Sequence, residues 1–380
     1  MFNIQTLNKI SPIGMERFGA DYNCGDNVEN PDAIMLRSFN MHDMEIPSSV
    51  KAIARAGAGV NNIPIDKCSE KGIAVFNTPG ANANAVKELV VAGILLSSRK
   101  IVEGVNWAST LTEDIAKAVE KGKSQFIGPE VTGKKIGVIG LGAIGVMVCN
   151  AAHALDMEVI GYDPYISVDA AWHLSRAIHK ASSLKEIFEQ CDYITIHVPL
   201  NDETKDTVNK ETIAQMKDGV RILNFARGGL VNTEAILEAV ASGKVAKYVT
   251  DFPDEDMINK ENIIAIPHLG ASTPESEDNC AVMAAKELIS YLETGNVVNS
   301  VNFPRCVMER STDVRICIFH KNVPNMIGQI SKHFAEMNIN IENMINKGRG
   351  DYAYTMIDVD HEVNPEEIKI DGILSIRVIK

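Results

Sequence analysis

The 380-residue sequence contains no run of 18 apolar residues, so we expect no transmembrane helix. Its first residues, MFNIQTLNKISPIG, do not place a basic segment before an apolar one, which argues against a secretory signal. The seven cysteines are scattered and form no CxxC pair, so reduced thiols are favoured over disulfides or a metal site. The sequence therefore predicts a cytoplasmic protein without a membrane partner or a bound metal.

Basic residues are also fewer than acidic ones. The chain has 37 Lys and Arg residues against 50 Asp and Glu residues, a formal net charge of −13. An acidic surface repels phosphodiester backbones, so we expect no nucleic-acid partner. A few local arginines can still bind a small anion, because charges beyond a Debye length are screened. The hydrophobic content of 45% is that of a globular protein, and the length exceeds one core of ~150 residues.

The clearest pattern lies in the middle of the chain. The run KKIGVIG (134–140) predicts a strand, and the turn GLGAIG (140–145) follows at once. Apolar residues at helical spacing come next, and EVIGYD (158–163) predicts a second strand that ends in an acid. A lone GxGxxG can be a purely structural turn, but this order of elements is typical of a dinucleotide-binding βαβ unit.

Each residue of that unit has a mechanical role in cofactor binding. Gly140 makes the tight turn, Gly142 admits a pyrophosphate, and Gly145 lets the helix and the strand pack closely. The helix N-terminus offers unpaired N–H groups to the phosphates. Asp163 can accept both ribose hydroxyls and would repel a 2′-phosphate, so NAD is favoured over NADP.

Short apolar runs elsewhere indicate two more groups of strands. Strands are predicted at 33–37, 50–57 and 72–77, and then at 193–199, 221–226, 248–252 and 263–268. Helical patterns between them, including 84–99 and 274–291, favour parallel sheets covered on both faces. The last residues have the order strand, helix, strand, strand, short helix, strand. We therefore expect an α/β fold with two Rossmann-like doubly wound domains and a C-terminal βαββαβ (ferredoxin-like) domain.

Three polar side chains follow strands of the central half. Arg227, Glu255 and His268 come after the strands at 221–226, 248–252 and 263–268. Ligands of open parallel sheets bind beyond the carboxyl ends of the strands, where these side chains would meet. An arginine can hold a carboxylate, and a histidine oriented by a carboxylate can move a proton. Spacing alone does not separate this set from a turn arginine and a surface histidine.

Six ordered stretches identify a family. They are ARAGAGVNNI (54–63), FNTPGANANAV (76–86), IGVIGLGAIG (136–145), HVPLNDET (197–204), NFARGGLVN (224–232) and PHLGAS (267–272). With them, residues 33–300 closely resemble the D-isomer-specific 2-hydroxyacid dehydrogenases. The resemblance implies that Arg227 is the catalytic arginine and His268 the general acid/base. The family carboxylate follows a D-V-F-x-x-E-P pattern, but TDFPDED is one residue short here, which leaves Glu255 or, less favoured, Asp256.

The resemblance also implies binding residues. Cofactor contacts are expected at Thr78, Gly140, Gly142, Ala143, Ile144, Gly145, Asp163, Ala226, Asp251 and Gly270. The substrate loop is expected at Arg55, Ala56, Gly57 and Asn61, with Arg55 as the main phosphate-binding candidate and Arg37 as a weaker one.

The family layout predicts three domains. The substrate domain would comprise 1–100 and 272–306, and the NAD-binding domain 101–271. Residues 312–380 resemble an ACT domain, in which serine would bind between paired modules at His320, Asn322 and Asn340. The family N-R-P-G turn is NVPN here (322–325), and Asn325 tolerates the left-handed backbone that glycine provides. The module either senses L-serine or serves assembly alone.

The branch of the family that the chain most resembles oxidises D-3-phosphoglycerate to 3-phosphohydroxypyruvate with NAD, the first step of L-serine biosynthesis. We expect this activity from a homo-oligomer, either a dimer or a tetramer. One alternative is another small D-2-hydroxy acid, such as glycerate, as substrate. The other is a scaffold that senses NAD without catalysis.

Overall fold

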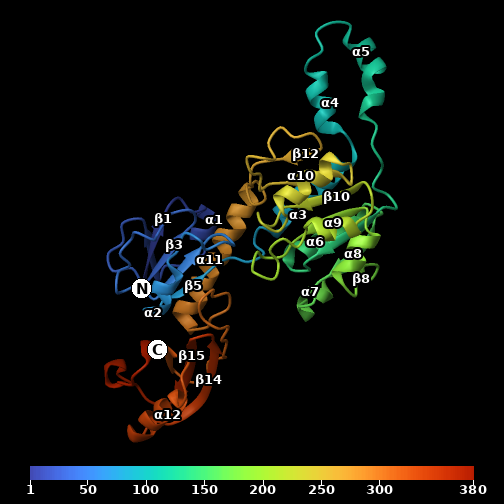
Figure 1. Cartoon of the computed structure of the whole chain (residues 1–380). Coiled ribbons are helices and arrows are strands. Elements are labelled where there is room, and N and C mark those ends of the chain that lie inside the picture. Colours follow the sequence, from blue (N-terminus) through green and yellow to red (C-terminus); the bar gives the residue numbers. More distant parts are fainter. The chain divides into compact units, whose positions relative to one another are not determined.

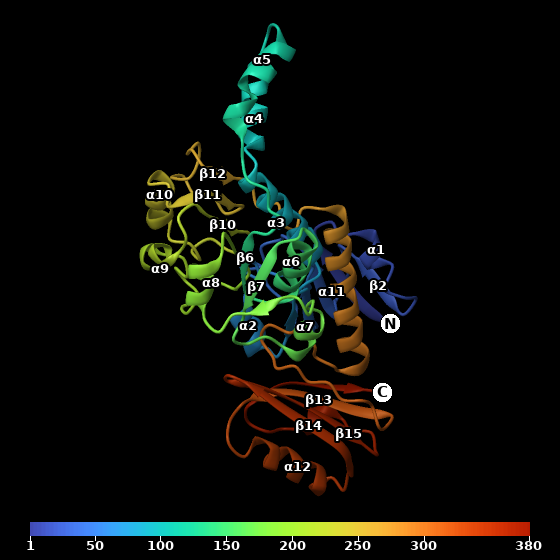
Figure 2. The ribbon, with the colours of Figure 1, turned by 90° about the vertical axis from the view of Figure 1, so that its right-hand side faces the viewer.

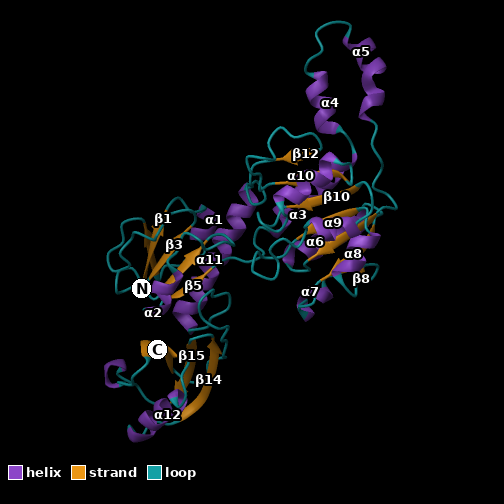
Figure 3. Ribbon diagram, in the orientation of Figure 1, coloured by secondary structure: helices purple, strands orange, loops and turns teal.

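The computed structural model describes all 380 residues, which divide into two compact units (Figure 1). Unit 1 comprises residues 1–82 and 274–380, and unit 2 comprises residues 83–273. Helices and strands alternate in both units, as Figure 3 shows. The α/β fold predicted from the sequence is confirmed, with two parallel sheets and a separate antiparallel sheet. No helix combines the length and the apolar composition needed to cross a bilayer.

The parallel sheet of unit 1 has five strands in the order β2-β1-β3-β4-β5. The strands are β1 (Phe2–Leu7), β2 (Tyr22–Gly25), β3 (Ala33–Leu36), β4 (Ala52–Arg55) and β5 (Ala74–Phe76). The first two were not predicted, because only Ile4 in β1 is fully buried and the apolar pattern there is weak. Helices α1 (Pro12–Met15) and α11 (Pro274–Thr294) pack on one face, and α2 (Ile65–Glu70) on the other.

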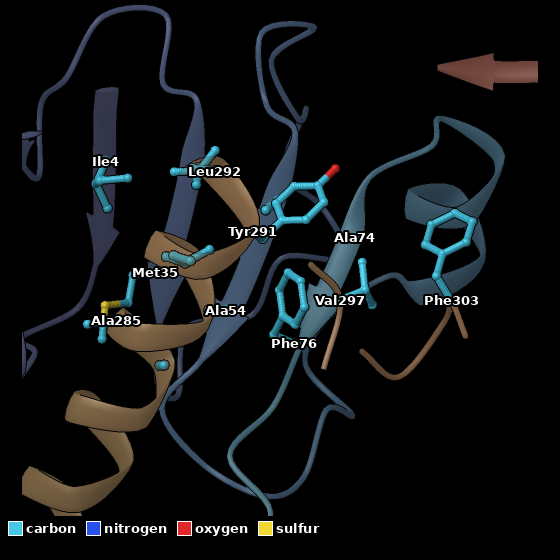
Figure 4. Packing of buried hydrophobic residues seen from close by; sticks show 14 of the residues in the cluster. Ile4, Met35, Ala54, Ala74, Phe76, Ala285, Tyr291, Leu292, Val297 and Phe303 are labelled. Atoms are coloured by element: carbon cyan, nitrogen blue, oxygen red, sulfur yellow. The ribbon is translucent and has the colours of Figure 1, made fainter. Parts of the chain in front are cut away.

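Helix α11 buries small and large apolar side chains against this sheet. Ala284, Ala285 and Leu288 are fully buried in one cluster with Met35 and Ala54. Figure 4 shows this packing around Met35 and Ala285, and shows the Tyr291 and Phe76 rings near each other. The centroids of these two rings are 5.6 Å apart.

The C-terminal sheet of unit 1 is antiparallel, in the order β14-β15-β13-β16. Its elements are β13 (Val314–Lys321), α12 (Met326–Glu336), β14 (Ile341–Arg349), β15 (Tyr352–Val359) and β16 (Ile373–Ile379). Buried residues of α12 cover one face of the sheet. Where the sequence predicted a second short helix, the chain makes one 3₁₀ turn, η2 (Pro365–Glu367), because little more than a dozen residues connect β15 to β16.

The C-terminal sheet also binds the end of α11. The last carbonyls of a helix have no partner within it and need other donors. Side chains of the sheet donate hydrogen bonds to them: Arg377 to the Tyr291 and Leu292 oxygens, Arg315 to Thr294 and Tyr354 to Gly295. The Arg377 guanidinium lies 4.1 Å from the centre of the Tyr291 ring. The helix terminus is therefore capped by another part of unit 1.

Arg315 makes the most buried ion pair of this region. Its Nε lies 2.7 Å from Asp358 Oδ1 and its Nη2 lies 2.9 Å from Oδ2, a bidentate arrangement. Neither side chain is exposed to solvent. The Ser311 N–H and hydroxyl also donate to Asp358, so the carboxylate is well satisfied.

Unit 2 contains a seven-stranded parallel sheet in the order β12-β11-β10-β9-β6-β7-β8. The strands are β6 (Lys135–Ile139), β7 (Glu158–Tyr162), β8 (His179–Lys180), β9 (Tyr193–Ile196), β10 (Val220–Asn224), β11 (Val245–Thr250) and β12 (Ile263–Ala265). The strand order reverses between β6 and β9, which is the ligand-binding switch point of such sheets.

Helices cover both faces of this sheet. Helices α3 (Ala83–Ser98) and α6 (Ala143–Ala154) bury residues on one face. Helices α8 (Leu184–Gln190), α9 (Lys210–Gln215) and α10 (Thr233–Ala241) bury theirs on the other. The short α7 (Val168–Trp172) follows β7.

The start of unit 2 differs from the predicted domain layout. The unit begins at Ala83 rather than at residue 101, because α3 packs on its sheet, with Gly93 close against Phe225 and Leu223. Helices α4 (Ile101–Ala108) and α5 (Ile115–Gly122) with η1 (Lys123–Phe126) then form an arm that extends from the rest of unit 2 (Figures 1 and 2). Trp107 and Phe126 pack together there, with ring centroids 5.2 Å apart.

A buried acid in α11 leads to a prediction about stability. Glu287 is 7% exposed; its Oε1 accepts a hydrogen bond from Asn299, and its Oε2 has no partner. Burial raises its pKa from 4.5 to about 7. Because the folded state then holds the proton more tightly than the unfolded chain, stability falls as pH rises from about 4.5 to 7, by on the order of 3 kcal/mol.

Glu287→Gln should remove this dependence and raise the melting temperature at pH 8 relative to the unsubstituted chain. Thermal melts at pH 5 and pH 8 measure the difference, and the exposed Glu261→Gln serves as control. Equal pH dependence in both variants would contradict the prediction.

Candidate functional site

The glycine-rich turn after β6 lies at the switch point of the unit 2 sheet. Gly140 has a φ of +92°, and a Cβ at this position would lie 2.6 Å from the His197 carbonyl oxygen. A Cβ on Gly145 would lie 1.9 Å from the Gly140 oxygen. Both positions therefore require glycine, as the sequence predicted for a tight turn packed against a helix.

Gly142 differs from Gly140 and Gly145, because a Cβ added at Gly142 would face open space, with no atom within 4 Å. It is the N-cap of α6 and no side chain caps this helix. Ala143 and Ile144 form the first turn, so their backbone N–H groups are among those without a partner inside the helix. An uncapped helix N-terminus beside an open space suits the pyrophosphate of a dinucleotide.

Asp163 follows β7 and is half-buried. Its Oδ2 accepts a hydrogen bond from the Leu141 N–H and its Oδ1 accepts one from Tyr165, both at 2.8 Å. These bonds hold the carboxylate next to the turn, and each oxygen keeps a lone pair for a ribose hydroxyl. The turn, the helix terminus and this acid together fit NAD.

The loop after β10 presents Arg227. Its side chain is exposed, and its Nη1 donates to the Ala226 carbonyl at 2.7 Å. The loop is shaped by Asn224, which is 1% exposed, donates to the Arg227 carbonyl and accepts from the Ala226 N–H. Asn224 was not singled out from the sequence, where it reads as the last residue of a strand.

His268 follows β12 and is exposed. The Phe252 ring lies against it, with centroids 4.5 Å apart. Asp251 is 1% exposed and neither carboxylate oxygen has a hydrogen-bond partner. Burial raises the pKa of Asp251, whereas the charge of His268, the backbone near Gly270 and the charge of Arg227 lower it. The charges of Arg227 and His268 therefore both act on the buried Asp251 carboxyl.

Glu255 is not part of this group. It is exposed in the loop after β11 and makes no hydrogen bond or ion pair. The loop is held by its neighbour Asp254, which accepts hydrogen bonds from the Thr233 hydroxyl and the Asp256 N–H. Asp256, the other carboxylate considered, is exposed as well.

The expected substrate loop lies in unit 1, after β4. Arg55 donates from its Nε to the Arg37 carbonyl at 2.8 Å, and its guanidinium lies beside Gly57 and Gly59. Thr78 is fully buried and its N–H donates to the Gly57 carbonyl. Arg37 forms an ion pair with Glu277 at 2.7 Å. Ala56 is buried and Asn61 is exposed near this loop.

The three residues expected to bind serine do not form one group within the chain. His320 is 2% exposed; its ring nitrogens bond to the Lys321 carbonyl and the Thr355 hydroxyl. Asn322 follows β13 near the Tyr352 end of β15, whereas Asn340 lies near the Val359 end. Both are exposed. A site with all three would need a second copy of the module. Asn325 adopts the expected left-handed conformation, with a φ of +65°.

Comparisons with known proteins agree with this geometry. Residues 91–270 match the NAD-binding domain of the D-isomer specific 2-hydroxyacid dehydrogenases. The chain is 32% identical over 371 residues to the D-3-phosphoglycerate dehydrogenase of Haemophilus influenzae, covering 93% of this chain and 87% of that protein. It is 32% identical over 332 residues to the enzyme of that name from Methanocaldococcus jannaschii, covering 85% of this chain but 61% of that longer protein.

A solved structure extends the comparison to the fold. The NAD-complexed D-isomer specific 2-hydroxyacid dehydrogenase from Lactobacillus delbrueckii has a TM-score of 0.65 and 21% identity. The match covers 79% of this chain and 100% of that one. At this identity the likeness concerns the fold alone.

Proposed function

Because the chain belongs to the D-isomer specific 2-hydroxyacid dehydrogenases, we propose that it oxidises D-3-phosphoglycerate to 3-phosphohydroxypyruvate with NAD. The observation that supports the proposal is that the charges of Arg227 and His268 both act on the buried Asp251 carboxyl, in the same unit as a turn that fits a dinucleotide. The phosphorylated substrate is supported by relatives that carry the name D-3-phosphoglycerate dehydrogenase.

The roles follow from the chemistry of these side chains. Arg227 binds the substrate carboxylate and polarises the oxygen on C2, for which a planar guanidinium is suited. His268 takes the proton of the C2 hydroxyl as general base, and returns it in the reverse direction. NAD, when bound, supplies the acceptor for the C2 hydride. Arg55 binds the substrate phosphate, and Glu255 stays a sequence prediction as the partner of His268.

We place the enzyme in the cytoplasm, at the first step of L-serine biosynthesis. All seven cysteines are free, as suits a reducing compartment. The C-terminal module would bind L-serine between two copies, since His320, Asn322 and Asn340 do not meet within one chain. The protein is then a homo-oligomer, a dimer or a tetramer.

Oxidation of NADH with 3-phosphohydroxypyruvate, with and without millimolar L-serine, tests the proposal. We expect turnover with a higher kcat/KM than for hydroxypyruvate, and inhibition by serine. A higher kcat/KM for hydroxypyruvate than for 3-phosphohydroxypyruvate would instead indicate that glycerate is the substrate. NADH binding without turnover on any D-2-hydroxy acid would favour the non-catalytic scaffold.

Cofactor binding is tested at Gly142. Its φ of −75° suits any residue, and a side chain there enters open space, so Gly142→Val is expected to fold normally. The valine would occupy the space in front of the α6 N-terminus and should weaken NADH binding about 10-fold or more, the loss of ~1.4 kcal/mol. Fluorescence titration with NADH measures the change. Gly19→Val, also in open space but in unit 1, is the control; equal affinities in the two variants would contradict the prediction.

A further inference from the structure

We propose that Glu277 competes with the phosphate of the substrate for Arg37. Glu277 neutralises the arginine when no substrate is bound and releases it to the incoming phosphate. It thereby sets how strongly the chain prefers a phosphorylated keto acid over an unphosphorylated one. The inference deepens the proposed function, in which Arg55 binds the substrate phosphate, and it rests on that function.

Arg37 and Arg55 lie at the same edge of the parallel sheet of unit 1. Strands β3 and β4 are paired in parallel with Leu36 opposite Arg55, so Arg37 comes one residue after this register point. The Arg55 Nε donates to the Arg37 carbonyl at 2.8 Å. Ligands of parallel sheets bind at the carboxyl ends of the strands, and a guanidinium can donate two parallel hydrogen bonds to a phosphate. Two arginines at this edge therefore fit a phosphate group.

The first turns of α11 lie against these arginines. The Arg37 Nη1 is 2.7 Å from Glu277 Oε1. Cys280 follows three residues later in the helix; burial raises the pKa of its thiol, whereas the positive charges of Arg37 and Arg55 lower it. Both positive charges therefore act on the same part of α11. Glu277 places one negative charge beside this pair of arginines, in the position of a bound anion.

The ion pair is weak enough to be exchanged. The side chains of Arg37 and Glu277 are 42% and 45% exposed, and water screens a pair as exposed as this one. A phosphate monoester carries a charge of roughly −1.5 to −2 at pH 7, whereas a carboxylate carries one negative charge. The phosphate therefore displaces Glu277 from Arg37. A keto acid without a phosphate leaves the ion pair in place.

Two other roles of Glu277 predict different results when its charge is removed. A surface ion pair without a role in binding predicts the same KM for the phosphorylated keto acid. A carboxylate that holds Arg37 in position for the phosphate predicts a higher KM. Competition predicts the opposite direction, a lower KM, because the phosphate no longer has to displace another anion. The direction of the change in KM decides between the three roles.

The test compares Glu277→Gln with Glu275→Gln in the full chain. Glu275 is the matched control, since it is exposed, lies in the same first turn of α11 and loses the same charge. The kcat and KM values for 3-phosphohydroxypyruvate and hydroxypyruvate are measured at saturating NADH and constant ionic strength, because salt screens exposed charges. Glu277→Gln should lower the KM for 3-phosphohydroxypyruvate about 5-fold, the equivalent of ~1 kcal/mol, and should raise the preference for it over hydroxypyruvate by the same factor. Glu275→Gln should keep that preference.

Arg37→Gln provides a second comparison. Alone, it should raise the KM for 3-phosphohydroxypyruvate. When Glu277→Gln is added to it, the further decrease in KM should be much smaller than 5-fold, because there is no arginine left to compete for. An equal decrease with and without Arg37 would mean that Glu277 only repels the phosphate, and would overturn the proposal. An unchanged or higher KM in Glu277→Gln alone, or an equal change for both keto acids, would overturn it as well.

Binding of inorganic phosphate separates this inference from the proposed function, because it needs no turnover. The phosphate concentration that gives half of the maximal rise in Tm should be about 5-fold lower for Glu277→Gln than for the unsubstituted chain and Glu275→Gln. An unsubstituted chain that reduces neither keto acid would refute the proposed function, and the phosphate titration would still test Glu277. Equal phosphate concentrations for Glu277→Gln and Glu275→Gln would overturn the inference.

Discussion

His268→Ala is expected to lose turnover of 3-phosphohydroxypyruvate by about 10²–10⁴-fold, the usual contribution of a general acid/base. We expect the variant to lose proton transfer while it keeps its ability to bind the substrate and the cofactor. Arg227 would still bind the substrate carboxylate, and the turn at Gly142 would still bind the cofactor, but no group would supply the proton to the C2 oxygen. Affinity for NADH should therefore change little, because the dinucleotide turn does not involve His268.

Two measurements separate this prediction from simple damage to the fold. Added imidazole should restore part of the activity of His268→Ala, since a free base can enter the vacated space. His153→Ala, an exposed histidine in the last turn of α6, is the matched control and should keep full activity. Normal turnover of the His268 variant would refute the proposed mechanism.

The largest effect on stability is expected from Arg315→Leu. This change leaves Asp358 buried without its counter-charge and removes the donor to the Thr294 and Met308 carbonyls. Loss of one partner of a buried ion pair typically costs about 3–5 kcal/mol. Urea unfolding followed by circular dichroism measures the loss. The double variant Arg315→Leu with Asp358→Leu should be more stable than Arg315→Leu alone, because no buried charge remains unpaired.

The same pair makes unit 1 sensitive to acid. Burial alone would raise the pKa of Asp358, but the hydrogen bonds from Arg315 and Ser311 outweigh burial and lower it. Since the folded pKa lies below the unfolded one, the stabilisation is present at neutral pH and is lost as pH falls through the folded value. If the double variant Arg315→Leu with Asp358→Leu were as unstable as Arg315→Leu alone, this account of the buried ion pair would be wrong.

Patterns that repeat locally were predictable from the sequence. Strand–turn–helix order located β6, α6 and β7, because a buried parallel strand is a short apolar run and its helix has a 3.6-residue period. The resemblance then singled out Arg227 and His268, which follow β10 and β12 in the structure.

Contacts between distant residues were not predictable in this way. Arg315 and Asp358 are 43 residues apart, and each alone is typical of a charged surface residue. The sequence assigned α3 to the first domain because its apolar face does not reveal which sheet it covers. Likewise Glu255 could be aligned from Phe252, but only the structure shows that Glu255 is exposed whereas Asp251, at the end of β11, is buried.

The capped end of α11 limits how the chain can be shortened. A truncation near Ser311, meant to isolate the catalytic part, would remove the donors to the carbonyls of Tyr291, Leu292, Thr294 and Gly295 at once. It would also uncover Phe303, whose ring stacks on Phe319 at 3.9 Å. The shortened protein would have a frayed α11 terminus and an exposed aromatic patch. Its poor solubility or low activity would then reflect this damage, and would not show that the catalytic part needs an effector bound to the C-terminal sheet.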